Sequence, residues 1–97
     1  MKPIIATDAN FDKVIEQSDL PVLVDFSAHW CPPCRAMEPV MEQLDEELNR
    51  KALVLQIDVD TNPATTARFG VRKLPTFLFF DKRKPVTKII GPHPKQH

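Results

Sequence analysis

The hydrophobic positions of the chain repeat with two different spacings. Runs in which nearly every residue is apolar, at positions 22–26 and 53–57, predict strands buried on both faces of a sheet. Between them, apolar side chains recur at steps of three and four from Pro32 to about Arg50, which predicts a helix with one apolar face. The residues of that face are Met37, Val40, Met41, Leu44 and Leu48.

Shorter segments complete the pattern. Asn10 suits the N-cap of a helix that carries Phe11, Val14 and Ile15 at helical spacing and ends near Ser18. A second short helix is expected at positions 63–67, and further strands at 4–7, 76–80 and 86–90, with a charged turn over 81–85. The resulting order, β-α-β-α-β-α-β-β, predicts an α/β protein with a parallel core and an antiparallel extension, in one domain of residues 1–97.

Composition and charge exclude several classes of function. Thirteen basic and thirteen acidic residues cancel, so no global field attracts nucleic acid or an anionic membrane. The apolar runs are too short to span a bilayer, and Pro3 with two aspartates by position 12 leaves no room for a secretory signal. We therefore expect a cytoplasmic protein, in which cysteines are kept mostly reduced.

Both cysteines lie in the stretch WCPPCR, which admits three interpretations. A structural disulfide closing so short a loop would add little stability. A zinc site would need His93 and His97, but 58 residues separate Cys34 from His93, and Pro94 opposes the helix that would align the histidines. The remaining interpretation, a redox pair beside a βαβ pattern, is the one we favour, with no metal and no bound cofactor.

The helical spacing also separates the two sulfur atoms. Cys34 continues the apolar face that runs through Met37 and Met41, whereas Cys31 precedes the first full turn. We expect Cys34 to be shielded and Cys31 exposed. A thiol at a helix N-terminus is stabilised as the thiolate, so Cys31 is predicted to attack and Cys34 to resolve.

Three blocks of the sequence, VLVDFSAHWCPPCRAMEPV, QIDVDTNP and FGVRKLPTFLFF, resemble the thioredoxin family in order and spacing. The resemblance covers roughly residues 4–91. It implies the thioredoxin fold, a central mixed five-stranded sheet flanked by helices. It also implies dithiol–disulfide exchange with disulfide-containing protein substrates, and recharging by a disulfide reductase such as thioredoxin reductase.

Residue roles follow from the same resemblance. Asp25 matches the buried acid behind the second cysteine, Pro39 the kink of the active-site helix, and Pro75 a cis proline packed against the cysteines. The residues expected to bind substrate are Trp30, Pro32, Pro33, Val59, Val71, Leu74, Pro75, Ile90 and Gly91.

The sequence departs from the family at several of these places. Pro32 replaces a glycine, Ser27 a tryptophan and Lys73 a glycine, while Gln56 replaces the lysine that faces the buried acid. Without that lysine, burial should raise the pKa of Asp25.

The family has a final helix after the residue matching Gly91, where six residues remain here. The strand at 76–80 should therefore lose part of its cover on one face, through either Phe77 and Phe79 or Leu78 and Phe80. We expect self-association or low stability.

These features predict a protein disulfide oxidoreductase that reduces protein disulfides through Cys31 and Cys34. Two alternatives remain. The same residues could run in reverse in a thiol oxidase or isomerase, and a thioredoxin-fold domain could bind partners without catalysis. The reduction potential of the cysteine pair separates the three.

Overall fold

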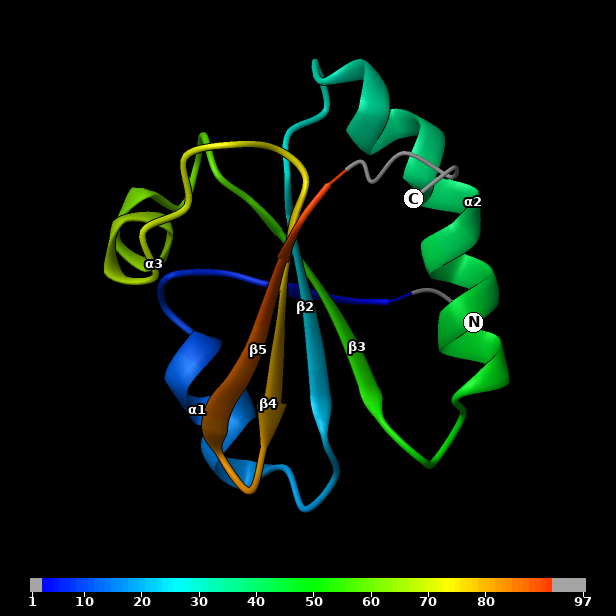
Figure 1. Cartoon of the computed structure of the whole chain (residues 1–97). Coiled ribbons are helices and arrows are strands. Elements are labelled where there is room, and N and C mark those ends of the chain that lie inside the picture. The colour runs from blue at the N-terminus through cyan, green and yellow to red at the C-terminus, as the bar shows by residue number, and fades with distance from the viewer. Residues whose placement is uncertain (1–2, 92–97) are drawn as a thin grey trace.

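The computed structural model describes residues 3–91 and arranges five strands in one sheet with three helices around it (Figure 1). The strands follow the order β1-β3-β2-β4-β5, with β5 at one edge. In chain order the elements are β1 (Ile4–Ala6), α1 (Phe11–Gln17), β2 (Val22–Ser27), α2 (Pro32–Glu47), β3 (Leu53–Asp58), α3 (Pro63–Arg68), β4 (Thr76–Asp81) and β5 (Lys84–Ile90). The predicted order of strands and helices is confirmed.

The pairing of the strands agrees with the predicted parallel core and antiparallel extension. β1 and β2 both run parallel to β3, which lies between them. β4 is antiparallel to β2, and β5 is antiparallel to β4. The central strand β2 thus has a neighbour on each side and carries the residues that lead into the cysteine pair.

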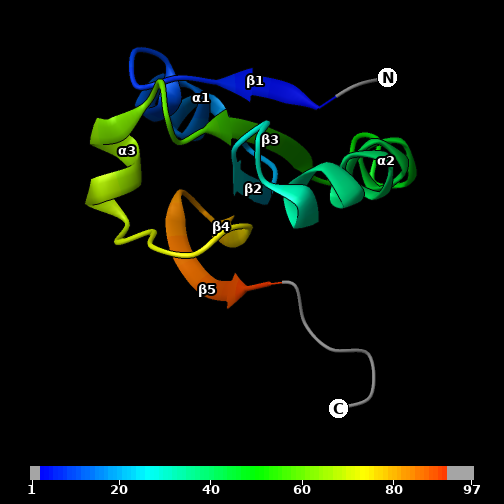
Figure 2. The ribbon, with the colours of Figure 1, turned by 90° about the horizontal axis from the view of Figure 1, so that it is seen from above.

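Helices cover both faces of the sheet (Figure 2). On one face, α1 contributes Phe11 and Ile15 to a core that includes Val24 of β2. On the other face, Met41 of α2 packs against Leu23 of β2 and against β3. Because side chains alternate along a strand, Asp25 points to the same face as Leu23, toward α2.

Two boundaries differ by two residues or more from the sequence-based expectation. Helix α2 ends at Glu47 rather than near Arg50, which has a positive φ of 67°. The turn between β4 and β5 contains only Lys82 and Arg83, both with positive φ, so β5 begins at Lys84 instead of position 86. Two residues with positive φ fit the right-handed twist of a hairpin, which lets both strands extend further into the charged segment.

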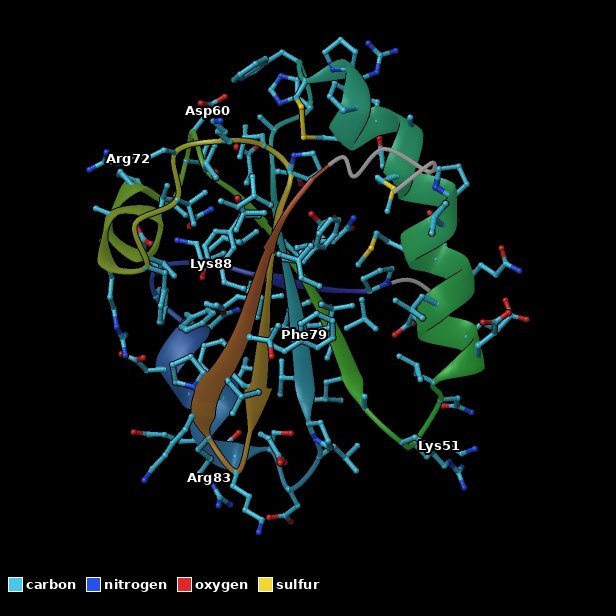
Figure 3. All side chains as sticks on the ribbon, viewed as in Figure 1. Lys51, Asp60, Arg72, Phe79, Arg83 and Lys88 are labelled. Carbon is cyan, nitrogen blue, oxygen red and sulfur yellow. A yellow bond between two sulfur atoms is a disulfide. The ribbon has the colours of Figure 1, made fainter. Side chains whose placement is uncertain are left out.

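The cover of β4 is uneven, as predicted. Leu78 and Phe80 are buried on the face of α1 and α3. Phe77 is half-buried and Phe79 is 37% exposed on the face of α2. Figure 3 shows Phe79 between β5 and α2, on the part of the sheet that α2 leaves open. An apolar patch therefore remains there in the part of the chain that the structure describes.

Helix α3 is fixed at both ends by residues from distant segments. At its start, the carboxylate of Asp8 accepts hydrogen bonds from the backbone N–H groups of Ala64 (3.1 Å) and Thr65 (2.8 Å). Hydrogen bonds from the side chain and backbone of Thr65 hold the pKa of Asp8 below its ordinary value. At its end, Lys88 of β5 donates to the carbonyl oxygen of Phe69 at 3.0 Å. The loop that follows α3 is thereby anchored before it reaches the cysteine pair.

Within residues 3–91, no helix has the length and apolar character needed to cross a membrane. His93 and His97, which were considered for a zinc site, lie outside the described residues.

Candidate active site

Cys31 and Cys34 form a disulfide at the start of α2, with their Cα atoms 5.2 Å apart. Cys31 is the N-cap of the helix, and its Sγ accepts a hydrogen bond from the backbone N–H of Cys34 at 3.3 Å. Pro32 and Pro33 occupy the first helical positions, where a missing N–H costs no intrahelical hydrogen bond. The two prolines therefore suit the first turn and place both sulfur atoms at the helix N-terminus.

The expectation that Cys31 is exposed is wrong for this disulfide form. Both cysteines are only 4% exposed, because Ala28 belongs to the same cluster and Val59 and Leu74 pack against it. Ala28 follows β2, Val59 follows β3 and Leu74 precedes β4, so the spacing within α2 gives no information about these covering residues.

The two cysteines nevertheless open onto different cavities. Cys31 lies in a groove whose other lining residues are Trp30, Pro32, Pro33, Val59, Thr66, Val71, Arg72 and Leu74. Cys34 lines a separate pocket, together with Ile5, Ser27, Ala28, His29, Glu38, Gln56, Ile57 and Asp58. Both cavities have mainly apolar surfaces, but the pocket has more polar side chains in its lining than the groove, so the two cysteines have different neighbours.

Trp30 forms one wall of the groove. Its side chain is 58% exposed, in agreement with the predicted surface position, and its indole N–H donates a hydrogen bond to Asp60. Figure 3 shows Asp60 and Arg72 at the end of the molecule where the disulfide lies. An exposed indole held by a hydrogen bond offers a large apolar surface at low entropic cost.

Pro75 lies beneath the groove rather than in its lining. The Leu74–Pro75 peptide bond is cis, as the family resemblance implies, and the Pro75 side chain is fully buried. The backbone N–H of Gly91 donates to the carbonyl oxygen of Pro75 at 2.9 Å. Ile90 and Gly91 are thus connected to the groove through Pro75, but neither lines it.

Pro39 lies inside α2, as the sequence predicts, and the helix axis changes direction in its first half (Figure 1). A proline in a helix removes the hydrogen bond to the residue four positions earlier, here Arg35. The first turns of α2 therefore run at an angle to the rest of the helix.

Asp25 lies on β2, on the face of the sheet that α2 covers. It is 2% exposed, and Nε2 of Gln56 donates to its Oδ2 at 3.4 Å. Its Oδ1 is buried and has no hydrogen-bond partner within residues 3–91. Burial raises the pKa of Asp25 to about 6, with a smaller contribution from the charge of Glu38, while the hydrogen bond from Gln56 opposes the shift. The predicted direction is confirmed.

The structure adds four residues to the predicted site. Thr66 and Arg72 line the groove, Asp60 binds the indole of Trp30, and Glu38 lines the pocket beside Cys34. Arg72 could have been suspected from its place between two predicted docking residues. Glu38 could have been suspected as well, since it lies one helical turn after Cys34 in the predicted helix. Thr66 and Asp60 are brought in by tertiary packing and have no local signal. No group of three or more His, Cys, Asp or Glu side chains gathers as a metal site in the part of the chain described.

The fold and the paired sulfur atoms define a protein disulfide oxidoreductase that acts by dithiol–disulfide exchange. The chain belongs to the thioredoxin family, whose model matches residues 2–97.

Individual relatives of known family agree with this assignment. A thioredoxin of Alicyclobacillus acidocaldarius is 49% identical over 90 residues, which cover 93% of this chain and 85% of the relative. A thioredoxin of Staphylococcus haemolyticus is 42% identical over 97 residues, covering all of this chain and 91% of the relative. A thioredoxin of Rickettsia bellii is 39% identical over 89 residues, which cover 92% of this chain and 85% of the relative.

Proposed function

We propose that the protein works in the reducing direction and transfers electrons from its dithiol to disulfides of protein substrates. The Cys31 thiolate attacks one sulfur of the substrate disulfide, which forms a mixed disulfide and releases the first substrate thiolate. Cys34 then transfers its proton to Asp25 and attacks the sulfur of Cys31. The substrate leaves with the electron pair of the broken bond, and the Cys31–Cys34 disulfide is restored.

One observation carries this proposal: Cys31 opens onto the apolar groove and Cys34 onto the pocket near Asp25. A substrate bound in the groove meets Cys31 first. The proton of Cys34 is removed on the opposite side, where a carboxylate of raised pKa is a better match for a thiol than an ordinary aspartate.

The remaining predicted residues are assigned to docking. Trp30, Pro32, Pro33, Val59, Val71 and Leu74 would contact the substrate directly, since they line the groove. Pro75, Ile90 and Gly91 would support it from beneath. A reductase of the thioredoxin reductase type must recharge the pair, and the cycle requires a reducing compartment such as the cytoplasm.

The reduction potential of the cysteine pair tests the direction. Equilibration of the protein with glutathione buffers, followed by mass spectrometry of the trapped thiols, should give a value at or below the cytosolic glutathione potential. A value well above it would make the protein a thiol oxidant or isomerase. Thiols that never exchange with glutathione or with a substrate would leave only a binding module.

We also propose that the protein associates with a second copy of itself, supported by the partly exposed Phe77 and Phe79 beside the edge strand β5. Light scattering over a concentration series should show a mass that rises with concentration, and Phe79→Ser should lower it. A monomer of unchanged mass at the highest concentration would rule out this association.

A further inference from the structure

The pocket beside Cys34 has a volume of about 230 Å³, which is large enough for several water molecules. Its polar lining comes from four places: Ser27 at the end of β2, His29 before α2, Glu38 on α2, and Gln56 and Asp58 on β3. Asp58 lies 3.6 Å from Nδ1 of His29, so these two side chains face each other at one side of the pocket. The β1 side of the pocket is formed by Ile5, which carries no charge.

Asp25 needs this pocket to exchange its proton with water. Its side chain is almost completely buried, and Gln56, which contacts it, is also a lining residue of the pocket. On β4, the residue opposite Asp25 is Phe77, which offers no polar group. A proton that Asp25 receives from Cys34 therefore has one polar way out among the described residues, past Gln56 and into the pocket.

Glu38 stands on this route. It lies one helical turn after Cys34, so both side chains are on the same side of α2, and both line the pocket. Its side chain is exposed, and within residues 3–91 it makes no hydrogen bond or ion pair. Glu38 is thus a carboxylate that is exposed to water and also lines the pocket.

We propose that Glu38 is a positioning residue of the exchange reaction: its negative charge at the mouth of the pocket sets the pH range in which Asp25 is ionised and so can accept the proton of Cys34 when the mixed disulfide is resolved. The proposal rests on the proposed role of Asp25. As the new S–S bond forms, the proton of Cys34 moves to Asp25 and the substrate sulfur leaves with its electron pair. The proton then passes through the pocket to water near Glu38.

The physical basis is repulsion between two carboxylates in a partly dry environment. A nearby negative charge disfavours ionisation of Asp25, which agrees with the direction in which Glu38 shifts the pKa of that group. The lysine that the family pattern has at position 56 would lower the pKa of Asp25, whereas Gln56 carries no charge. In this chain Glu38 would therefore set the pH at which Asp25 becomes able to accept a proton.

Glu38→Gln removes the charge and keeps the shape, and Glu42→Gln is the matched control. Glu42 is exposed on the same helix, one turn further from the disulfide, and does not line the pocket. Carbon-detected NMR titration of the oxidised protein measures the pKa of Asp25 directly. We expect Glu38→Gln to lower it by roughly half a unit or more, and Glu42→Gln to leave it nearly unchanged.

Kinetics of mixed-disulfide resolution give the second readout. If the rate follows the ionised fraction of Asp25, Glu38→Gln should be about threefold faster than wild type at pH 5 and similar at pH 8. Glu38→Asp, which keeps the charge, should retain most of the wild-type profile. An unchanged titration of Asp25 in Glu38→Gln, or equal shifts in both Gln variants, would overturn the role of Glu38. The titration needs no turnover, so it decides this point even if the protein reduces no substrate.

Discussion

The two sides of the disulfide differ in the side chains that line them. The groove beside Cys31 is lined mainly by apolar side chains, with Trp30 exposed at its edge. The pocket beside Cys34 also has a mainly apolar surface, but five polar side chains contribute to its lining: Ser27, His29, Glu38, Gln56 and Asp58. Since the two cysteines are equally buried, exposure alone would not distinguish them.

The difference between the two sides suits two separate tasks, binding a substrate polypeptide and removing a proton. An apolar groove binds a polypeptide by excluding water and does not need to discriminate between many charge patterns. Removing a proton requires the opposite, a polar route to solvent and a base of suitable pKa. In the proposed mechanism the two functions lie on the two sides of one disulfide, so the substrate stays away from the base, and variants can test the two sides separately.

The largest effects should come from the cysteines. Cys31→Ser should abolish reduction of a protein disulfide such as insulin, because no nucleophile faces the groove. Cys34→Ser should still attack but should accumulate mixed disulfides through Cys31, visible as a mass increase equal to the substrate. At neutral pH, alkylation of the reduced wild type should modify Cys31 before Cys34, as determined by peptide mapping. Faster alkylation of Cys34 would reverse the assignment.

The second effect concerns the pocket side. Asp25→Asn should slow resolution of the mixed disulfide on the order of 100-fold, because Cys34 loses its proton acceptor, while the first attack by Cys31 should keep its rate. Stopped-flow kinetics with a fluorescent disulfide peptide resolve the two steps. If Asp25→Asn slowed the attack by Cys31 as much as the resolution by Cys34, or slowed neither step, the separation of the two sides would be contradicted.

The same variant should change stability with a definite sign. The pKa of Asp25 is raised in the folded protein, so the native state holds a proton that the unfolded chain has released. Its stability is therefore fullest below about pH 4 and falls as pH rises toward 6, by roughly 3 kcal/mol in total. Asp25→Asn should be more stable than wild type at pH 8 and similar near pH 4, as measured by denaturant titration of the oxidised proteins.

A smaller effect is expected on the groove side. Trp30→Ala should raise the KM for a protein substrate about 5- to 30-fold, the usual cost of removing an aromatic anchor from an interface. Resolution of a preformed mixed disulfide should change little. Val86→Ala is a suitable control, because Val86 is an exposed apolar residue of β5 outside the groove. A similar KM for Trp30→Ala and wild type would remove the indole from substrate docking.

The sequence predicts the framework well because the elements carry local signals. β2 and β3 are apolar along most of their length because both faces of the sheet are covered there. Helix α2 is apolar at every third or fourth residue because one of its faces is buried. The short helix expected at 63–67 is found as α3, and Gly70 just after it has a positive φ, which suits the end of a helix. Boundaries were less certain: the tight turn at Lys82 and Arg83 uses two long charged residues in a conformation that usually favours Gly or Asn.

The site was predictable only in part, for a related reason. Asp25 and Gln56 were paired correctly through the family resemblance, and the contact between them follows from adjacent positions on paired strands. The burial of Cys31 depends on how residues from separate loops pack over the start of α2. No periodicity within one segment encodes contacts of that kind, so they needed the three-dimensional structure.

The link between Asp8 and α3 has a consequence for the order of folding. A helix of six residues does not persist in water by itself, and the N–H groups at its start are bound by a residue 56 and 57 positions earlier in the chain. Such a contact forms only after β1 has joined β3, because that pairing brings the two segments together. We therefore expect α3, and with it the wall of the groove formed by Val71 and Leu74, to become ordered late, after the transition state for assembly of the sheet.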